Sequence, residues 1–498
     1  MAITDSAYAA WLRTDAPREI LAEIQCWHGG SKQTRYLARR GFQSGFFDQP
    51  KSQVYEALIQ SVPLFRQAID APIPLGEMAL FNPTGSLDSW LQDDWAGHEI
   101  RLLMGDPSWN RRDFRTILTG VISDIIAPAS NSLVFSLRDK KERLNIPAQS
   151  RLIEDEDSPS HGQPIPQCLG YNYNLEPILR DASNQVYQVH DGAIKAITQV
   201  RDDGVPVEFS ANLRAGTFTL KTQPQGAIRA DVQGAIIKGA YRDTGADLVR
   251  HLVTREALTA EDLDSASFTA FKSLCPQPVG LYLKDSTNLA DCLDHIITQT
   301  LGGYWYFDRL GKLKLWRLDN PTGTASHEFN PDDFPRNTLT IQRRDQPIEK
   351  IELGFFRNWA PQEAGSLSES VGALARSRQS TEYARSVKTQ TASGFKDRYP
   401  LAAKPPLQGT LFSAYDGLGI RATAKADCDA EAIRRRDLFS VVRTTYSAKL
   451  TAGAFQLHLG DEIKIRHPRF GFADGQNAIV VGIEESPTGG AATVEFWR

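Results

Sequence analysis

The sequence predicts a β-dominated α+β protein with several domains. Runs of β-branched and aromatic residues, separated by Gly, Pro, Asn and Asp, fill both ends of the chain, as in proteins built from short strands. Helical periodicity is concentrated in the middle, so that region should mix helices with strands. At 498 residues the chain is too long for a single core. Roughly three domains of about 100–200 residues are therefore expected.

One short β pattern occurs twice, at positions far apart in the chain. The first copy contains GHEIRL, ILTGV and LVF, and the second contains GDEIKI, IVVGI and TVEF; the matched ranges are 97–102 with 460–465, 117–121 with 479–483, and 133–135 with 493–496. The steps from Gly97 to Gly120 and from Gly460 to Gly482 differ by one residue. Each copy reads as strand, polar loop, strand, turn, strand. The sequence thus predicts two copies of one small β-module.

The N-terminal region should open with a short helix and continue as strands. We expect the helix within residues 7–22 and strands at 19–27, 34–42 and 78–81, followed by the first module copy up to Arg138 and a brief helix at 139–144. The stretch EDEDSPSHGQPIP, residues 154–166, is rich in charge, Pro, Ser and Gly, and so indicates a linker or exposed loop.

The middle region predicts short strands followed by helices. Apolar spacing indicates helices at 247–257, 267–274 and 289–301, the last ended by Gly302-Gly303, and then a hairpin formed by 304–308 and 312–318 around an Arg-Leu-Gly turn.

The C-terminal region predicts strands at 338–342 and 349–356, a polar loop with weak helical character over 359–381, and a charged helix at 425–442 ahead of the second module copy. The expected domains are a β-barrel domain at 1–150, an α+β domain at 151–335, and a second β-barrel domain at 336–498 that is interrupted by the loop and helix.

Composition narrows the class of protein. The net charge is −4, from 56 basic and 60 acidic residues, and no basic stripe of the kind that a dedicated nucleic-acid binder carries is evident. No stretch approaches the 18 or so consecutive apolar residues of a membrane span, and the first residues do not read as a signal peptide. The five cysteines are scattered and odd in number, which favours synthesis in a reducing cytosol.

Two groups of residues suggest chemistry at first sight. Asp243-Thr244-Gly245, with Asp247 nearby, spells the triplet of aspartic proteases, but it precedes a predicted helix and is explained by a capping turn. Cys168, Cys275 and Cys292 could lie near one another and bind a metal or an iron–sulfur cluster. There is no CxxC spacing, and Cys292 lies on an apolar helix, so buried thiols are the favoured interpretation.

Three further features have both a functional and a structural interpretation. His98, His190 and His467 occur without HxH or HExxH spacing and are interpreted as surface or hydrogen-bonded side chains. The loop with Arg101, Arg111, Arg112, Arg115 and Trp109 could touch nucleic acid, but Asp106 and Asp113 favour a solvated loop or a subunit contact. The aromatic run 304–307 could stack on a sugar, but strand alternation explains it as core. We therefore predict no catalytic, cofactor-binding or metal-binding residues.

Several of these stretches resemble one family. The block GQPIPQCLGYNYNLEPILRD (162–181) with its following strands, the segment ADCLDHIITQTLGGYWYFDRLGKLKLWRL (290–318) and the terminal LGDEIKIRHPRFGFADGQNAIVVGIEES are similar to tail-tip or baseplate hub proteins of tailed bacteriophages. The resemblance covers nearly the whole chain after residue 90. It implies two related tube-forming β-barrels with a mixed α+β region between them, and assembly as a homotrimer.

In such a trimer, two barrels per chain would give a ring of six. The resemblance therefore implies a structural, non-enzymatic hub that joins a sixfold tail tube to a threefold central fibre or tip. Its expected partners are the distal tail protein ring, the tape measure protein and the fibre, with DNA passing through the lumen without sequence-specific contacts. The expected location is the virion tail tip, assembled in the host cytoplasm. The alternatives are a tail-associated cell-wall hydrolase and a host receptor-binding protein.

Overall fold

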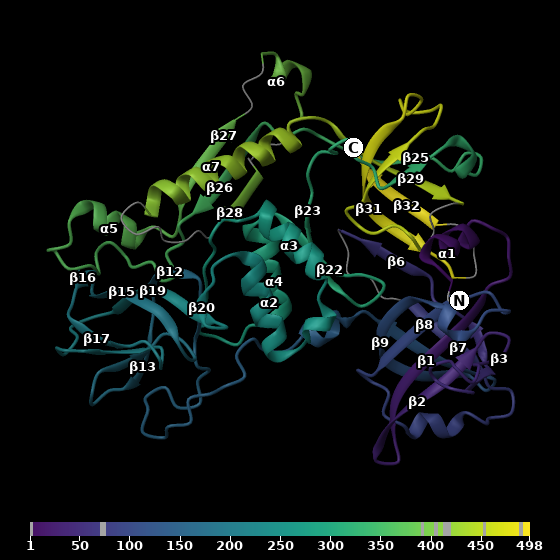
Figure 1. Ribbon diagram of the computed structural model, residues 1–498. Coiled ribbons are helices and arrows are strands. Elements are labelled where there is room, and N and C mark those ends of the chain that lie inside the picture. Colours follow the sequence, from purple (N-terminus) through teal and green to yellow (C-terminus); the bar gives the residue numbers. More distant parts are fainter. Residues whose placement is uncertain are drawn as a thin grey trace.

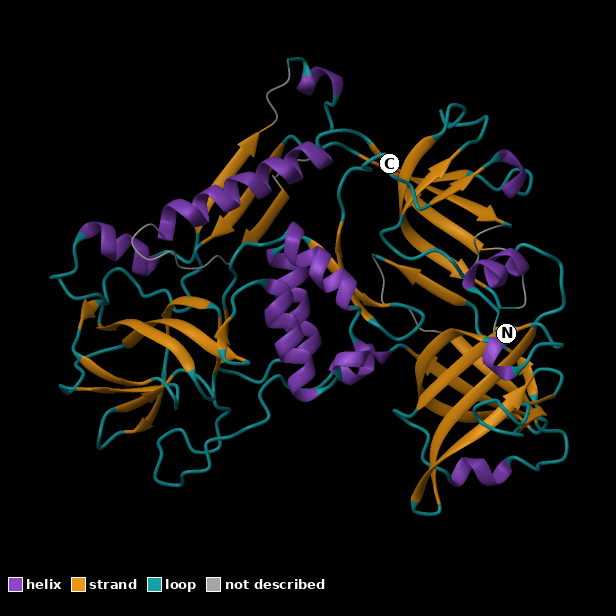
Figure 2. Ribbon diagram, in the orientation of Figure 1, coloured by secondary structure: helices purple, strands orange, loops and turns teal. Residues whose placement is uncertain are grey.

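The computed structural model describes residues 3–69, 76–389, 393–402, 407–411, 420–451, 455–487 and 492–498 (Figure 1). Strands dominate, and most helices gather in the middle of the molecule (Figure 2). The β-dominated α+β class predicted from the sequence is confirmed. None of the helices in the described part of the chain is long and apolar enough to span a bilayer.

The N-terminal region forms one nine-stranded sheet with the strand order β3-β4-β2-β1-β8-β9-β10-β7-β5. A short helix, α1 (Asp5–Leu12), precedes it. The strands are β1 (Glu19–His28), β2 (Ser31–Ala38), β3 (Phe42–Gln43), β4 (Val54–Ala57), β5 (Ile59–Ser61), β7 (Gly76–Phe81), β8 (Glu99–Gly105), β9 (Arg115–Ala129) and β10 (Ser132–Arg138). As described, this order is an open path rather than a closed barrel.

The C-terminal sheet has the order β24-β30-β31-β32-β29-β25. A seventh strand, β6 (Phe65–Ala68), joins it by pairing with β31, although it comes from the N-terminal region. The other strands are β24 (His327–Phe329), β25 (Thr340–Asp345), β29 (Arg443–Leu450), β30 (Glu462–Ile465), β31 (Gln476–Glu485) and β32 (Ala492–Trp497). This path is also open as described.

The two module copies form the same three-stranded meander. β8, β9 and β10 make the N-terminal module, and β30, β31 and β32 make the C-terminal module. Glu99 pairs with Val121 as Glu462 pairs with Ile479. The N–H of Gly97 donates to the Ile122 carbonyl and that of Gly460 to the Val480 carbonyl, each at 2.8 Å. Both glycines have positive φ, which glycine adopts without strain.

A β-bulge lies at the corresponding place in both modules. The β9–β10 register skips Ser123, and the β31–β32 register skips Val481, which is its counterpart. A bulge adds one residue to one strand and bends it, so the shared bulge gives both modules the same bend. The predicted match of Gly120 with Gly482 is wrong by four positions, because strand pairing makes Gly482 the counterpart of Asp124.

The middle region combines small sheets with a group of helices. Its strands are β11 (Gln167–Leu169), β12 (Tyr171–Leu175), β13 (Ile178–Asp181), β14 (Val186–Gln188), β15 (Ile194–Asp202), β16 (Val205–Pro206), β17 (Phe209–Asn212), β18 (Thr217–Leu220), β19 (Ile228–Ile237), β20 (Ala240–Tyr241), β21 (Leu281–Leu283), β22 (Gly303–Phe307) and β23 (Leu313–Arg317). The helices are α2 (Gly245–Glu256), α3 (Ser265–Leu274) and α4 (Leu289–Leu293), which continues as a π-helix over Asp294–Thr300. All three predicted middle helices are confirmed.

The segment predicted as an interruption of the C-terminal domain forms a layer of its own. β26 (Lys350–Phe355) pairs with β27 (Ala384–Thr389) and β28 (Leu407–Leu411), and α7 (Ile420–Phe439) lies along this sheet (Figure 1). The remaining helices of the layer are α5 (Ala373–Ser380) and α6 (Phe395–Arg398). Its apolar residues, among them Ile351, Leu353 and Cys428, belong to the hydrophobic cluster of the middle helices.

Two boundaries differ from the sequence prediction. The short helix expected within 7–22 runs from Asp5 to Leu12, because the chain has entered β1 by Glu19. The predicted strand 34–42 begins earlier, as β2, and breaks at Arg39-Arg40-Gly41 before β3. The polar stretch 359–381 is a loop whose predicted helical character is found in α5.

Candidate assembly interface between the two modules

The two modules share one hydrophobic cluster. Counterpart positions of the two meanders are fully buried and belong to it: Ile100 and Ile463, Leu102 and Ile465, Ile122 and Val480, Phe135 and Val494, Leu137 and Phe496. The same cluster contains residues of α1 and β1. Because a close-packed interior has few low-energy arrangements, the two modules are held at one fixed angle to each other.

A strand from the N-terminal region joins the C-terminal sheet and reinforces this junction. Chain leaving β5 crosses to the C-terminal sheet and pairs antiparallel with β31 as β6, with Arg66 opposite Glu484 and Phe65 opposite Glu485. Phe65 is 3% exposed and lies edge-on to Phe455, with 6.2 Å between the ring centroids. The Ile69 N–H donates to the Val481 carbonyl at 3.1 Å and extends the ladder. The N-terminal region therefore supplies part of the C-terminal sheet.

The tip of the β22–β23 hairpin contacts both modules. The carbonyl of Arg309 accepts the N–H of Thr119 in β9 at 2.6 Å. Its guanidinium donates to the carbonyls of Leu457, at 3.0 Å, and Phe455, just before β30. One residue of the middle region thus links the two modules, because its backbone carbonyl binds β9 and its side chain binds two backbone carbonyls before β30.

A buried carboxylate lies beside this tip. Glu485, at the end of β31, is 3% exposed, and its carboxylate is 4.0 Å from the Arg309 guanidinium. Burial raises the pKa of Glu485, while Arg309 and the Phe455 N–H act in the opposite direction. The Arg309–Glu485 pair therefore places a carboxyl group beside a guanidinium inside the junction, where an unpaired charge is costly. The sequence showed only an ordinary Arg-Leu-Gly turn here, so no local signal could have identified it.

The Asp-Thr-Gly triplet is a helix start. Thr244 is the N-cap residue of α2, and its hydroxyl donates to the Asp247 carboxylate at 2.9 Å. Lys272 donates to the same carboxylate at 2.6 Å. Asp247 is thereby engaged by two side chains of the helix layer, which confirms the structural interpretation.

The three cysteines do not form a site. All are buried, with Cys168 in the cluster of the small sheets and Cys275 and Cys292 in that of the helices. Burial raises the pKa of Cys168 and Cys292 to about 12, so both are protonated thiols at neutral pH. Within the described ranges, no three His, Cys, Asp or Glu side chains gather as a metal site would require.

His190 is a buried, hydrogen-bonded histidine. Its Nδ1 accepts the Cys168 N–H at 3.0 Å, which requires the unprotonated nitrogen, and the residue is 4% exposed. Burial lowers the pKa of His190 from 6.5 to about 4. His467 lies edge-on to Phe334, and the backbone of His98 bonds Trp95 and Ile122 in the turn before β8. All three have structural roles.

Stability should therefore fall in mild acid. A histidine whose pKa is lowered by folding stabilises the folded state only while it is neutral. Its contribution to the free energy of unfolding is therefore complete above pH 6.5 and is lost as pH falls from 6.5 towards 4. For His190 the expected loss is about 3 kcal/mol. Urea unfolding followed at pH 7 and pH 4 measures this loss.

A pair of variants assigns the loss to His190. His190→Asn keeps a hydrogen-bond acceptor but does not titrate, so it should reduce the pH dependence of unfolding. His161→Asn, the same substitution at an exposed site, is the control. Equal pH profiles for both variants would contradict the assignment.

The arginine-rich loop is a structural element of the N-terminal sheet. Arg111 is 9% exposed and donates to Glu23 and to the Tyr55 hydroxyl, each through Nε at 3.0 Å. Trp109 packs against Trp11 of α1, with centroids 4.7 Å apart. The predicted solvated loop is wrong at Arg111, whose charge is paired inside the protein.

The aromatic run before the hairpin turn is packed. The Tyr306 hydroxyl donates to the Leu459 carbonyl at 3.0 Å, and Trp305 donates to Asp294 at 2.7 Å. Tyr304 stacks on Trp316, and Phe307 is buried. These contacts confirm the interpretation of the run as core.

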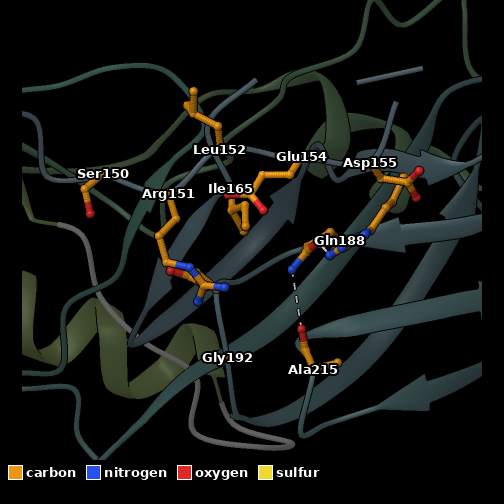
Figure 3. Close-up of a pocket in the computed structure, with 11 residues that line it drawn as sticks. Ser150, Arg151, Leu152, Glu154, Asp155, Ile165, Gln188, Gly192 and Ala215 are labelled. Carbon is orange, nitrogen blue, oxygen red and sulfur yellow. Dashed lines mark hydrogen bonds and ion pairs between the residues drawn. The ribbon is translucent and has the colours of Figure 1, made fainter. Parts of the chain in front are cut away.

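A polar pocket of about 580 Å³ lies in the middle region, lined by residues between Ser150 and Ala215 (Figure 3). Its carboxylates are Glu154, Asp155 and Asp191. Asp191 is held by Arg151 at 2.6 Å and by Arg255 at 2.8 Å, and Gln188 bonds the Ala215 carbonyl at 3.5 Å (Figure 3). Asp191 is therefore ion-paired with two arginines, whereas Glu154 and Asp155 are exposed.

No protein-family model and no curated protein matches the chain. Among solved structures, the chain is similar to a tail protein from Neisseria meningitidis MC58, with 9% identity over 97% of this chain and 96% of that one and a TM-score of 0.37. It is also similar to a 43 kDa tail protein of prophage MuSo2 from Shewanella oneidensis, with 9% identity over 96% and 98% of the two chains and a TM-score of 0.38. A third likeness is to a chain of a native gene transfer agent virion, with 13% identity over 70% and 87% and a TM-score of 0.43.

Proposed function

We propose that this chain is a non-enzymatic hub of a phage-type tail tip, acting as a homotrimer whose six β-modules form a ring. The observation that carries the proposal is the duplicated module. Two copies with matching register, matching bulge and one shared core give each chain two equivalent units at a fixed angle. Three such chains around an axis would place six similar units in a ring, and heterologous contacts close into such a ring when each chain is rotated by one third of a turn from the last. The resemblance noted in the sequence supports the same role.

In this role the chain joins a sixfold tube to a threefold fibre or tip. Each module and its surrounding strands, within 1–150 and 336–498, would complete a tube-forming barrel domain in the assembled particle, with the α+β domain at 151–335 on the periphery. The partners are the distal tail ring, the tape measure protein and the central fibre, and DNA passes through the lumen. A net charge of −4 suits a lumen that does not retain DNA, because retention depends on basic groups that bind phosphate. The protein is assembled in the host cytoplasm and resides in the virion.

The test is the solution mass of the purified chain. Light scattering should give three times the chain mass of 55.3 kDa, with ring-shaped particles in negative-stain images. The mass should stay constant on dilution over a wide range, since interfaces of permanent assemblies are large. A chain that remains a monomer, even when co-expressed with candidate tail partners, would refute the ring.

A further inference from the structure

The internal duplication identifies a sheet edge that has a partner in one module and none in the other. In the C-terminal module, residues 482–485 of β31 pair with β32 on one side and with β6 on the other. Their counterparts in the N-terminal module are residues 124–127 of β9. Asp124, Ile125 and Ile126 pair with β10, but among the described residues no strand pairs with their other edge.

This edge of β9 has features of an unpaired β-edge. Backbone groups point alternately to the two sides of a strand. Because the Val481 carbonyl accepts from β6, the N–H of Ile483 faces β6 as well, and its counterpart Ile125 faces the open side. The Ile125 N–H donates instead to the adjacent Asp124 carboxylate at 2.8 Å. Ile126 is 44% exposed, an unusual place for a branched apolar side chain.

The same duplication indicates which strand fits this edge. β7 and β29 are counterparts, since Met78 pairs with Phe135 as Ala448 pairs with Val494. β5 pairs with β7 and its chain continues into β6, whereas β25 pairs with β29. In the first case the pairing of Ser61 with Ala79, continued by three residues, places Leu64 opposite Gly76. In the second case Ile341 lies opposite Tyr446, the counterpart of Gly76. Leu64 and Arg66 are therefore the counterparts of Ile341 and Arg343. β25 therefore holds the place of the segment that ends in β6.

Pairing β25 with β9 requires a second copy of the chain. We propose that, in the assembled ring, the outer edge of β25 in one copy pairs antiparallel with the open edge of β9 in the next, as β6 pairs with β31 within each chain. The register follows from the counterparts: Arg343 lies opposite Ile126, as Arg66 lies opposite Glu484. This inference rests on the proposed ring and names the strands that close it.

The side chains of β25 suit an interface. β25 ends the path of its sheet, and residues 340–344 are exposed. Arg343, ion-paired with Asp345 at 2.9 Å, would face the edge that carries Asp124 and Ile126. One guanidinium would then lie among two carboxylates, which offsets the repulsion between Asp124 and Asp345 across the strands. The two exposed isoleucines, Ile126 and Ile341, would both lie at the seam.

Engineered disulfides test the contact. The double variant Ile126→Cys with Arg343→Cys should form interchain disulfides on mild oxidation, giving dimers and trimers on non-reducing gels. The matched control is Arg66→Cys with Glu484→Cys, which should close within a single chain because those residues already face each other. A slipped pair, Ile125→Cys with Arg343→Cys, places one thiol on the opposite face of its strand and should cross-link at least about tenfold less. The five native cysteines are buried and contribute little background.

The outcomes separate this inference from the ring itself. Cross-linking of the 126/343 pair in a trimeric chain supports both. A trimer by light scattering in which the control pair closes but the 126/343 pair does not would overturn the β25–β9 contact and leave the ring standing. A chain that is monomeric at every concentration, with the control pair closed, would overturn both. Equal cross-linking of the slipped and in-register pairs would overturn the proposed register and with it the contact.

Discussion

Replacing Arg309 by alanine should lower the free energy of unfolding by about 3–5 kcal/mol. The substitution removes the nearest cation from the buried Glu485 carboxylate and the donors from two carbonyls before β30. Because Arg309 lies where the hairpin tip meets both modules, the loss should affect the junction as a whole. The measurement is the urea unfolding midpoint of the full chain. Arg214→Ala, at an exposed turn, is the control and should change stability by less than about 0.5 kcal/mol.

A second substitution distinguishes charge from packing at this site. Glu485→Gln keeps the oxygen that accepts the Phe455 N–H but removes the buried charge. Added to Arg309→Ala, it should recover a substantial part of the lost stability. If the double variant is no more stable than Arg309→Ala alone, the cost lies in the lost carbonyl contacts rather than in the unpaired carboxylate.

The second large effect is expected at Gly280. A Cβ on this residue would lie 1.9 Å from the Tyr171 carbonyl oxygen. Two other glycines in this part of the fold are as tightly packed. A Cβ on Gly170 would lie 2.0 Å from the Val279 carbonyl oxygen, and a Cβ on Gly234 would lie 2.1 Å from the Cys168 carbonyl oxygen. These oxygens belong to backbone that is fixed by strand pairing, so it cannot move aside without breaking ladders. Gly280→Ala should cost more than about 3 kcal/mol, at the upper end of overpacking effects.

Thermal unfolding and limited proteolysis of the middle region measure this effect. The matched control is Gly365→Ala, where a Cβ would meet nothing within 4 Å and φ is not positive. It should be neutral within about 0.5 kcal/mol. A Gly280→Ala protein with unchanged unfolding and protease resistance would show that the strands around Tyr171 can separate more easily than their packing indicates.

The sequence predicted the features that depend on local pattern. Both modules alternate apolar and polar residues around turn residues, and α2 and α3 present apolar faces at helical spacing. The one error within the modules came from aligning Gly120 with Gly482. A glycine indicates conformational freedom and does not fix a position in a strand ladder. The register is instead defined by the pairing of Glu99 with Val121 in one module and of Glu462 with Ile479 in the other.

Long-range contacts had no local signal. β6 has only four residues, and nothing in FRQA indicates a partner in β31. The layer of β26, β27 and α7 was predicted as an interruption of the C-terminal domain, since sequence order does not say which core an inserted segment joins. Arg111 was predicted in a solvated loop because Asp106 and Asp113 adjoin it, whereas its partner, Glu23, comes from a distant strand. Within the junction, the β6–β31 pairing and the Arg309–Glu485 contact were both missed for this reason.

The pairing of β6 with β31 also has a consequence for synthesis. Residues 65–68 leave the ribosome more than 400 residues before their partners, residues 482–485. Until that later segment has been made, β6 has no C-terminal strand to pair with, and Phe65 remains without the ring of Phe455. Contacts of such wide sequence separation form late in folding. Nascent chains that have not yet reached residue 485 therefore cannot complete the junction, so any assembly that depends on it must wait for that segment, and fragments cut short before residue 482 would be excluded from the particle.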